Sequence, residues 1–312
     1  MSKKLTTKSL SRAQLRGFSI VPMLTPFTAA GALDEAAARR HVEHVVTAGS
    51  QGLLIAGTTG EAVSMPLEMR IRYTQLAIEQ VRGRAVVFGG IGDNSLAHSV
   101  ALTRAYFAAG ADAVVAHLPS YYPIGGEEME YHFRSLADRI EGPLYLYNIP
   151  QTTKHSIPLD VIERLSHHPR IAGIKDSEPD VERQVKLAGM FRGRTDFAVF
   201  AGMIAATSKA MRAGADGFVP SAGNIAPRAA RELMDRLVAG DEAGADAAQR
   251  RIDAISLVYQ KGRTVPQSMA AMKACLALLG VAERHMLPPL RAVDDATVEQ
   301  LRAGLREQGL LP

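Results

Sequence analysis

Three short stretches of the sequence repeat one pattern: AGSQGLLIAG at 48–57, AGADAVVAH at 109–117 and AGADGFVPS at 213–221. In each stretch the first glycine suits the left-handed residue that commonly ends a helix. The apolar run that follows has the length of a β-strand buried on both faces. The repeat therefore predicts helices that lead directly into buried strands.

Five further apolar runs fill the intervals between these repeats. They are FSIVPMLT at 18–25, AVVFGGIG at 85–92, PLYLYNIP at 143–150, IAGIKDS at 171–177 and DFAVFAGM at 196–203. Segments with helical spacing of apolar residues lie between the predicted strands, for example 34–48, 66–81 and 95–109. This alternation predicts an α/β protein, a parallel (β/α)8 TIM barrel, with a doubly wound open sheet as the alternative.

The sequence after the last predicted strand is wholly helical, which is more helix than the closure of a barrel requires. Helical patterns cover 227–239, 242–260, 267–279 and 295–307. We therefore expect an N-terminal extension at 1–17, a catalytic barrel domain at 18–227 and a C-terminal helical appendage at 228–312.

Composition and charge exclude several classes of function. The formal net charge of +4 is spread along the chain, so nucleic-acid binding is not expected. No apolar run reaches the roughly 18 residues of a membrane span, and the first 17 residues lack a signal-peptide core. The single cysteine, Cys275, cannot form an internal disulfide, which suits the cytoplasm. An organelle transit sequence is the alternative for the acid-free leader.

Lysine and tyrosine side chains end two consecutive predicted strands. Reactive groups of a (β/α)8 barrel come from the carboxyl ends of its strands, where Lys175 and Tyr147 are expected. Burial favours the neutral amine, which attack on a ketone requires, and a neighbouring phenol can transfer the protons. The alternatives are a Lys175 that reaches solvent or pairs with a carboxylate, and a Tyr147 that only packs.

Two glycine-rich segments differ in what they predict. The GTTGE turn at 57–61 offers two hydroxyls and backbone N–H groups that can hold a carboxylate, although the same residues also form ordinary turns. GGIGDNS at 89–95 lacks the third glycine of a dinucleotide fingerprint, because Ser95 stands in its place. The histidines form no ligand set, so a metal-dependent aldolase is not expected.

Taken together, these residues resemble the dihydrodipicolinate synthase and N-acetylneuraminate lyase family over about residues 18–292. The resemblance rests on VPMLTPF at 21–27, GLLIAGTTGE at 52–61, PSYYP at 119–123, YNIP at 147–150, GIKDS at 173–177 and LPPLR at 287–291. It implies a barrel with a C-terminal helical domain that forms a lysine imine with pyruvate. It also implies no metal or organic cofactor and a homotetramer built as a dimer of dimers.

The resemblance also implies roles for individual residues. Lys175 would form the imine, Tyr147 would be the catalytic phenol, and Thr58 and Thr59 would hold the carboxylate of the 2-oxo acid. Tyr121 falls where the family has a tyrosine donated across a subunit interface, and it would complete a proton relay with Thr59 and Tyr147.

Three further positions follow from the same resemblance. Gly202 and Val219 match positions that line the substrate pocket, and Glu61 is expected to support the site rather than to catalyse. Thr152 takes the place of an arginine that binds the aldehyde's carboxylate in dihydrodipicolinate synthases.

The leading interpretation is therefore a class I lyase that acts on a 3-deoxy-2-oxo sugar acid or a similar 2-oxo acid. The alternative is a dihydrodipicolinate synthase that condenses pyruvate with aspartate semialdehyde. A barrel that binds a 2-oxo acid without turnover is the alternative of another class. The presence of both Lys175 and Tyr147 argues against it, because binding alone needs neither nucleophile nor phenol.

Overall fold

The structure is a computed structural model and describes residues 11–312. Lys3, Lys4 and Lys8, on which the transit-sequence alternative depends, lie outside these residues. Within the described part, the strands form a closed parallel barrel in chain order. They are β1 (Phe18–Pro22), β2 (Gly52–Ile55), β3 (Val86–Gly90), β4 (Ala113–His117), β5 (Leu144–Asn148), β6 (Ile171–Asp176), β7 (Ala198–Ala201) and β8 (Gly217–Phe218). This confirms the predicted TIM barrel and rules out the open sheet.

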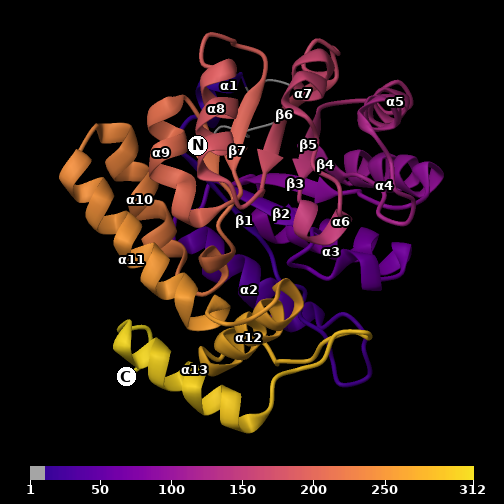
Figure 1. The fold of residues 1–312 in the computed structure, drawn as a ribbon. Helices are drawn as coiled ribbons and strands as arrows, with labels where there is room; N and C mark the ends of the chain where they lie inside the picture. The colour runs from indigo at the N-terminus through magenta and orange to yellow at the C-terminus, as the bar shows by residue number, and fades with distance from the viewer. Residues whose placement is uncertain (1–10) are drawn as a thin grey trace.

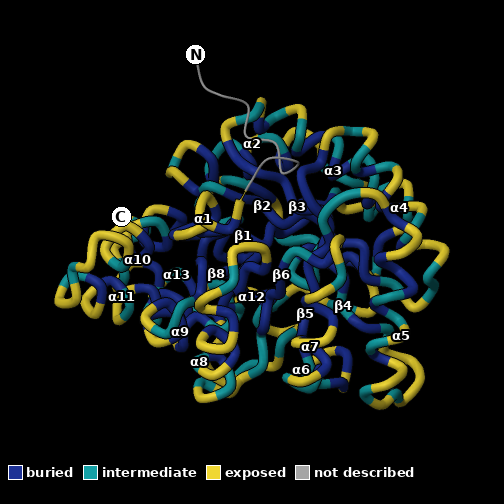
Figure 2. Tube along the Cα trace, turned by 90° about the horizontal axis from the view of Figure 1, so that it is seen from above, coloured by how far each residue is buried: buried dark blue, intermediate teal, exposed yellow. Residues whose placement is uncertain are grey.

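Helices surround the barrel, and their outer faces carry the exposed residues (Figure 2). The helices up to the eighth strand are α1 (Arg12–Leu15), α2 (Glu35–Thr47), α3 (Leu67–Val81), α4 (Leu96–Ala109), α5 (Gly126–Ala137), α6 (Pro150–Thr153), α7 (Leu159–Leu165), α8 (Val181–Met190) and α9 (Thr207–Ala213). Short 3₁₀ turns follow β2, β7 and β8 at η2 (Ala62–Ser64), η3 (Ile204–Ala206) and η4 (Ser221–Asn224). The repeat glycines do end helices, since Gly49 and Gly110 have φ of +94° and +99°.

Four helices follow β8: α10 (Pro227–Ala239), α11 (Glu242–Gln260), α12 (Val265–Leu278) and α13 (Asp295–Glu307). Because α10 contacts β1 and α9, it completes the helical layer around the barrel. The C-terminal helices beyond this layer are α11–α13, and the expected domain boundary at 227 coincides with the first residue of α10. In Figure 1, α1 lies at one end of the barrel and α12 at the other.

The barrel interior is filled by large apolar side chains. Phe88 packs edge-on against Tyr145 with ring centroids 5.3 Å apart, and Tyr145 contacts Phe200 at 5.9 Å. Burial raises the pKa of the Tyr145 phenol, as expected for a packing residue. The interior is therefore a packed core, and open space is found at the carboxyl ends of the strands.

The amino-terminal end of the barrel is closed by α1. The Arg12 guanidinium pairs with the Asp216 carboxylate at 2.8 Å, and both side chains are buried. Arg12 also donates to the backbone carbonyls of Phe191, Arg194 and Gly214. The last residues of the expected N-terminal extension are thereby docked against the barrel.

Candidate active site

Tyr147 and Lys175 lie side by side at the carboxyl ends of β5 and β6. The two residues are paired in the register of the parallel strands, and the Lys175 Nζ atom lies 4.0 Å from the centre of the Tyr147 ring. Since side chains alternate along a strand, both point to the barrel interior. The structure thus places together the two residues that the sequence predicted to converge.

Lys175 is buried without an anionic partner. Its residue is 6% exposed and Tyr147 is 5% exposed, so Lys175 does not extend into open solvent. Within residues 11–312, its amine takes part in no ion pair or hydrogen bond. An isolated buried amine is costly, which argues against a structural lysine and favours a chemical use for it.

The next residues along the same strands form a network on the opposite face of the sheet. Asp176 accepts a hydrogen bond from the Asn148 side chain at 3.1 Å and pairs with Arg183 at 3.0 Å. Burial raises the pKa of Asp176, while Arg183 and the hydrogen bonds oppose this effect. Asp176 is thus engaged by Arg183 and Asn148, and this network links β5 and β6 directly beside Tyr147 and Lys175.

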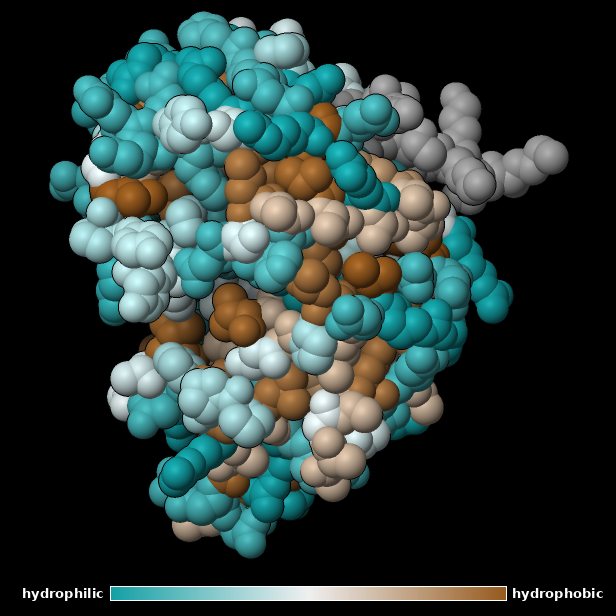
Figure 3. Space-filling model, turned by 90° about the vertical axis from the view of Figure 1, so that its right-hand side faces the viewer, coloured by the Kyte–Doolittle hydropathy of each residue, from teal (hydrophilic) through white to brown (hydrophobic). Residues whose placement is uncertain are grey.

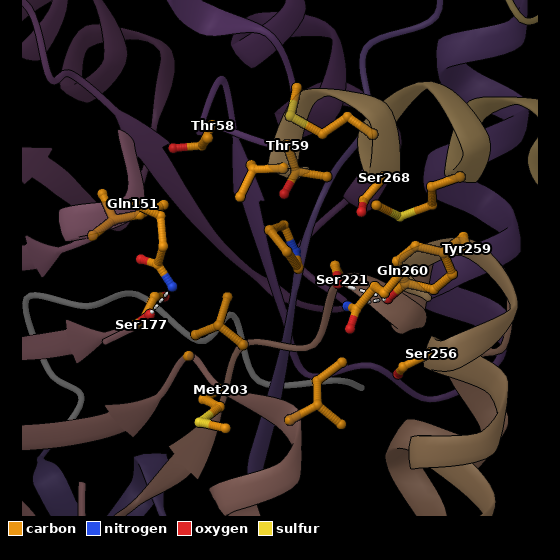
Figure 4. A pocket seen from close by; sticks show the side chains of 18 of the residues that line it. Thr58, Thr59, Gln151, Ser177, Met203, Ser221, Ser256, Tyr259, Gln260 and Ser268 are labelled. Carbon is orange, nitrogen blue, oxygen red and sulfur yellow. Dashed lines mark hydrogen bonds between the residues drawn. The ribbon is translucent and has the colours of Figure 1, made fainter. Parts of the chain in front are cut away.

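The two threonines of the GTTGE turn present free hydrogen-bond donors. Thr58 and Thr59 line the same pocket as Lys175. In the described part of the chain, their hydroxyls and backbone N–H groups donate no hydrogen bond. In Figure 4 the Thr59 hydroxyl points toward the middle of the pocket. The turn can therefore offer donors to a carboxylate.

A pocket of about 620 Å³ contains these groups. Gly202 and Val219, the two predicted lining residues, do line it. A side chain at position 202 would not fit, because a Cβ there would lie 2.7 Å from the backbone oxygen of Asp176 as well as 2.0 Å from the Ser177 Oγ atom. Glycine at this position therefore keeps the pocket open beside the end of β6.

Thr152 lies outside this pocket. It is exposed on α6, and its hydroxyl donates to the Ile149 carbonyl at 3.3 Å. The pocket is lined instead by its neighbour Gln151, whose amide nitrogen donates to the Ser177 carbonyl at 3.0 Å. A substrate-binding role for Thr152 stays a prediction.

Tyr121 is also absent from the pocket of its own chain. It is 79% exposed and packs edge-on against Tyr122. The side-chain oxygen of Asn94 accepts from the N–H groups of Ser120 and Tyr121 at 2.8 and 3.3 Å, which holds this loop in place. The tyrosine pair is therefore presented outward from the β4–α5 loop.

The helical appendage supplies part of the pocket that sequence reasoning missed. Residues of α11 and α12 line it opposite the strand ends, among them Tyr259, Gln260, Ser268, Met269 and Met272. In Figure 4, Tyr259 and Ser268 lie across the pocket from Gln151 and Ser177. The Tyr259 hydroxyl is 2.7 Å from the Ser221 hydroxyl. No local motif marks these residues, because only the folding of the appendage onto the barrel brings them there.

The histidines show no metal-binding arrangement. Within residues 11–312, no group of three or more His, Cys, Asp or Glu side chains is placed to hold a metal ion. His117, at the end of β4, has its Nδ1 atom 2.8 Å from the Leu118 carbonyl, and burial lowers its pKa.

None of the helices that the structure describes combines the length and hydropathy needed to cross a bilayer.

A closed barrel with a paired lysine and phenol at its carboxyl end, beside free donors for a carboxylate, defines a class I aldolase type of enzyme. The sequence profile of the Dihydrodipicolinate synthetase family matches residues 15–308. The chain therefore belongs to this family of pyruvate-using class I aldolases, and it is an enzyme rather than a non-catalytic binding barrel.

Individual relatives agree with this assignment over nearly the whole chain. The 4-hydroxy-tetrahydrodipicolinate synthase of Pseudomonas aeruginosa is 32% identical over 94% of this chain and 98% of the relative. The 4-hydroxy-tetrahydrodipicolinate synthase 1 of Streptomyces coelicolor is 34% identical over 93% of each chain. Among solved structures, Escherichia coli YagE, a prophage protein of the dihydrodipicolinic acid synthase family in complex with pyruvate, has a TM-score of 0.89. Its sequence identity is 27%, over 94% of this chain and 98% of that one.

Proposed function

We propose that this enzyme joins or cleaves pyruvate and an aldehyde through an imine at Lys175. The observation that carries the proposal is the buried Lys175 amine, 4.0 Å from the Tyr147 ring and without an anionic partner in residues 11–312. The neutral amine attacks the C2 carbonyl of the 2-oxo acid, and loss of water leaves the imine. Thr58 and Thr59 hold the carboxylate by their free donors.

The bond-breaking step assigns a role to Tyr147. Tyr147 first gives its phenolic proton to the carbinolamine hydroxyl, which leaves as water, so Tyr147 becomes a phenolate. In the cleavage direction this phenolate accepts the proton of the C4 hydroxyl, and the C3–C4 bond breaks. The electron pair of that bond moves onto C3 and is accepted by the protonated imine, while C4 leaves as the aldehyde. Condensation reverses these steps, with Tyr147 returning the proton. Gly202 and Val219 leave room for the reacting carbons.

Borohydride reduction in the presence of pyruvate tests the proposal. An imine is reducible, so a reduced pyruvyl group should appear on Lys175 and be found by peptide mass spectrometry. The exposed lysines Lys154 and Lys186 serve as internal controls. Absence of the adduct, or an adduct on either control lysine, would show that the mechanism is wrong.

The aldehyde that we expect to react with pyruvate is polyhydroxylated. In the cleavage direction the substrate is then a 3-deoxy-2-oxo sugar acid or a similar 2-oxo acid. Hydroxyl and amide groups line the pocket that contains the reacting lysine: Gln151, Ser177, Ser221, Ser256, Gln260 and Ser268. Such groups both donate to and accept from substrate hydroxyls. A screen of 3-deoxy-2-oxo acids for release of pyruvate would identify the substrate.

4-Hydroxy-tetrahydrodipicolinate synthase activity is the second candidate. The curated relatives carry this name, and Arg263 lines the pocket as a guanidinium that a second carboxylate could meet. Against it, Thr152 stands where the synthases have an arginine, and its hydroxyl already donates to the Ile149 carbonyl. The missing charge-assisted hydrogen bonds are a deficit of about 1.5–3 kcal/mol in binding a carboxylate. A catalytic efficiency above about 10⁴ M⁻¹s⁻¹ with pyruvate and aspartate semialdehyde would show that the enzyme is a synthase. In that case Arg263→Ala should abolish the synthase activity.

We also propose that the enzyme acts as a homo-oligomer, a dimer of dimers, in which Tyr121 enters the pocket of a neighbouring subunit. The side of the molecule where α3, α4 and α5 lie has apolar side chains grouped across its middle (Figure 3). Tyr121 lies on the loop before α5 and is exposed together with Tyr122. Tyr121→Phe should lower turnover while the matched Tyr122→Phe should not. A fully active monomer in analytical ultracentrifugation would contradict the proposal.

A further inference from the structure

The GTTGE turn is held in a strained conformation. The residues that bracket its two threonines, Ala56 and Glu61, have φ angles of +54° and +58°. Side chains other than glycine rarely adopt this left-handed region, and such residues persist only where the surroundings hold them in place. The conformation of Thr58 and Thr59 therefore depends on whatever anchors the two ends of the turn.

The anchor at one end is a buried ion pair with the appendage. The Glu61 Oε1 atom lies 2.5 Å from the Lys273 Nζ atom, and the two side chains are 0% and 1% exposed. The other carboxylate oxygen of Glu61 accepts from the Leu287 N–H at 2.9 Å. One carboxylate thus ties the turn after β2 both to α12 and to the segment that follows α12.

Lys273 is itself fixed from several sides. Its ammonium donates to the His285 carbonyl at 2.6 Å and lies 4.0 Å from the centre of the Phe27 ring. Burial lowers the pKa of Lys273 to about 8, although Glu61 acts in the opposite direction. The ion pair fixes the geometry of Glu61 and Lys273, but removing two charges from water costs free energy. A contribution to the stability of the fold is therefore a weak reason for its presence.

Neither member of this pair lines the pocket, yet both lie within two residues of one that does. Glu61 ends the turn that contains Thr58 and Thr59, and Lys273 directly follows the α12 residue Met272, which lines the pocket. The same ion pair therefore connects the threonine side of the pocket with its appendage side. We propose that Glu61 and Lys273 are positioning residues that hold the threonine donors for the carboxylate of the 2-oxo acid.

This inference rests on the proposed role of Thr58 and Thr59, and it makes the appendage a determinant of pyruvate binding. Its test uses the full chain and pyruvate alone. Formation of the imine and its enamine exchanges the methyl protons of pyruvate with D₂O, which proton NMR follows without any aldehyde. The rate against pyruvate concentration gives the half-saturating concentration and the limiting rate separately.

The deciding variant is the double substitution Glu61→Gln with Lys273→Met, which removes both charges and leaves neither buried alone. We expect it to fold and to form the imine on Lys175. In this variant Thr58 and Thr59 are no longer held in place to bind the carboxylate of pyruvate. The pyruvate concentration that gives half-saturation should therefore rise by about tenfold or more, the equivalent of one hydrogen bond. The limiting rate should stay within about threefold, because Lys175 and Tyr147 are untouched.

A matched control exists at the other end of the barrel. The double substitution Arg12→Met with Asp216→Asn removes a buried ion pair of similar exposure, 8% and 6%. It should lower the melting temperature without changing half-saturating pyruvate. An unchanged pyruvate dependence in the Glu61/Lys273 variant, or an equal change in the control, would overturn the positioning role.

If the Glu61→Gln/Lys273→Met variant does not fold, the double substitution Glu61→Gln with Lys273→Gln decides. It also removes both charges, so neither is left buried alone, and the two amides can hydrogen-bond in place of the ion pair. Unchanged half-saturation in this folded variant would contradict the inference. Failure of the wild-type enzyme to form the imine on Lys175 would instead contradict the proposed function, so the two outcomes are distinguishable.

Discussion

Two groups of polar side chains at opposite ends of the barrel, the contacts of Arg12 and the pocket around Lys175, differ in their hydrogen bonding. At the amino-terminal end, Arg12 is fully engaged by Asp216 and three backbone carbonyls. At the carboxyl end, the amine of Lys175 and the hydroxyls of Tyr147, Thr58 and Thr59 have no hydrogen-bond partner in residues 11–312. Buried polar groups are normally satisfied, so the contacts of Arg12 contribute to stability, whereas the unpartnered groups of the pocket do not and are free to meet a substrate.

The largest effect should come from removing the nucleophile at the carboxyl end. Lys175→Met should lower aldol turnover and D₂O exchange by about 10⁴ or more, because no imine can form. Its free energy of unfolding should be unchanged or higher, since an unpartnered buried amine is removed. Kinetics and urea unfolding measure the two quantities. A loss of stability with residual activity would break the contrast between the two ends.

Tyr147→Phe should have the next largest effect. It keeps the ring that packs under the Lys175 amine and removes only the hydroxyl, so half-saturating pyruvate should change by a small factor. Turnover should fall by about 10²–10⁴, the usual contribution of general acid–base catalysis. Steady-state kinetics with the substrate found by the screen provide the measurement. Unchanged turnover would show that Tyr147 serves only in packing.

Arg12→Met should show the opposite behaviour at the closed end. It leaves the buried Asp216 carboxylate without its cation, which costs about 3–5 kcal/mol of stability. The exchange rate per folded molecule should be unchanged. Urea unfolding together with the D₂O assay checks both parts, and adding Asp216→Asn should restore part of the stability. A selective loss of activity would mean that the two ends are coupled.

The smallest expected effect is on the pH dependence of stability, and it comes from a histidine in the helical layer around the barrel. His41 on α2 is fully buried, and burial lowers its pKa to about 3. Unfolding exposes it, and it then takes up a proton below about pH 6.5. Stability is therefore present above that pH and falls by about 1.4 kcal/mol per unit as the pH decreases toward 3. His41→Leu should flatten this dependence in urea unfolding at pH 7, 6 and 5, and an unaltered slope would exclude His41 as its source.

The barrel could be predicted from local pattern because its signals are local. Each strand is a short apolar run, and the glycines at 49 and 110 end helices with positive φ as expected. The packing partner of α10 was less accessible, since α10 looks like any amphipathic helix and only its contacts with β1 and α9 place it in the helical layer around the barrel. Helical spacing reveals which face of a helix is buried, but it does not reveal the element against which that face packs.

The sequence by itself determined which side chains could react. Lys175 and Tyr147 end consecutive strands, and parallel strands in register bring their ends together. Only the tertiary structure decided what surrounds them. Gln151 rather than Thr152 lines the pocket, α12 provides its far wall, and Glu61 meets Lys273 across 212 positions of the chain. Such contacts depend on how the appendage folds back onto the barrel, and no periodicity within one segment encodes that.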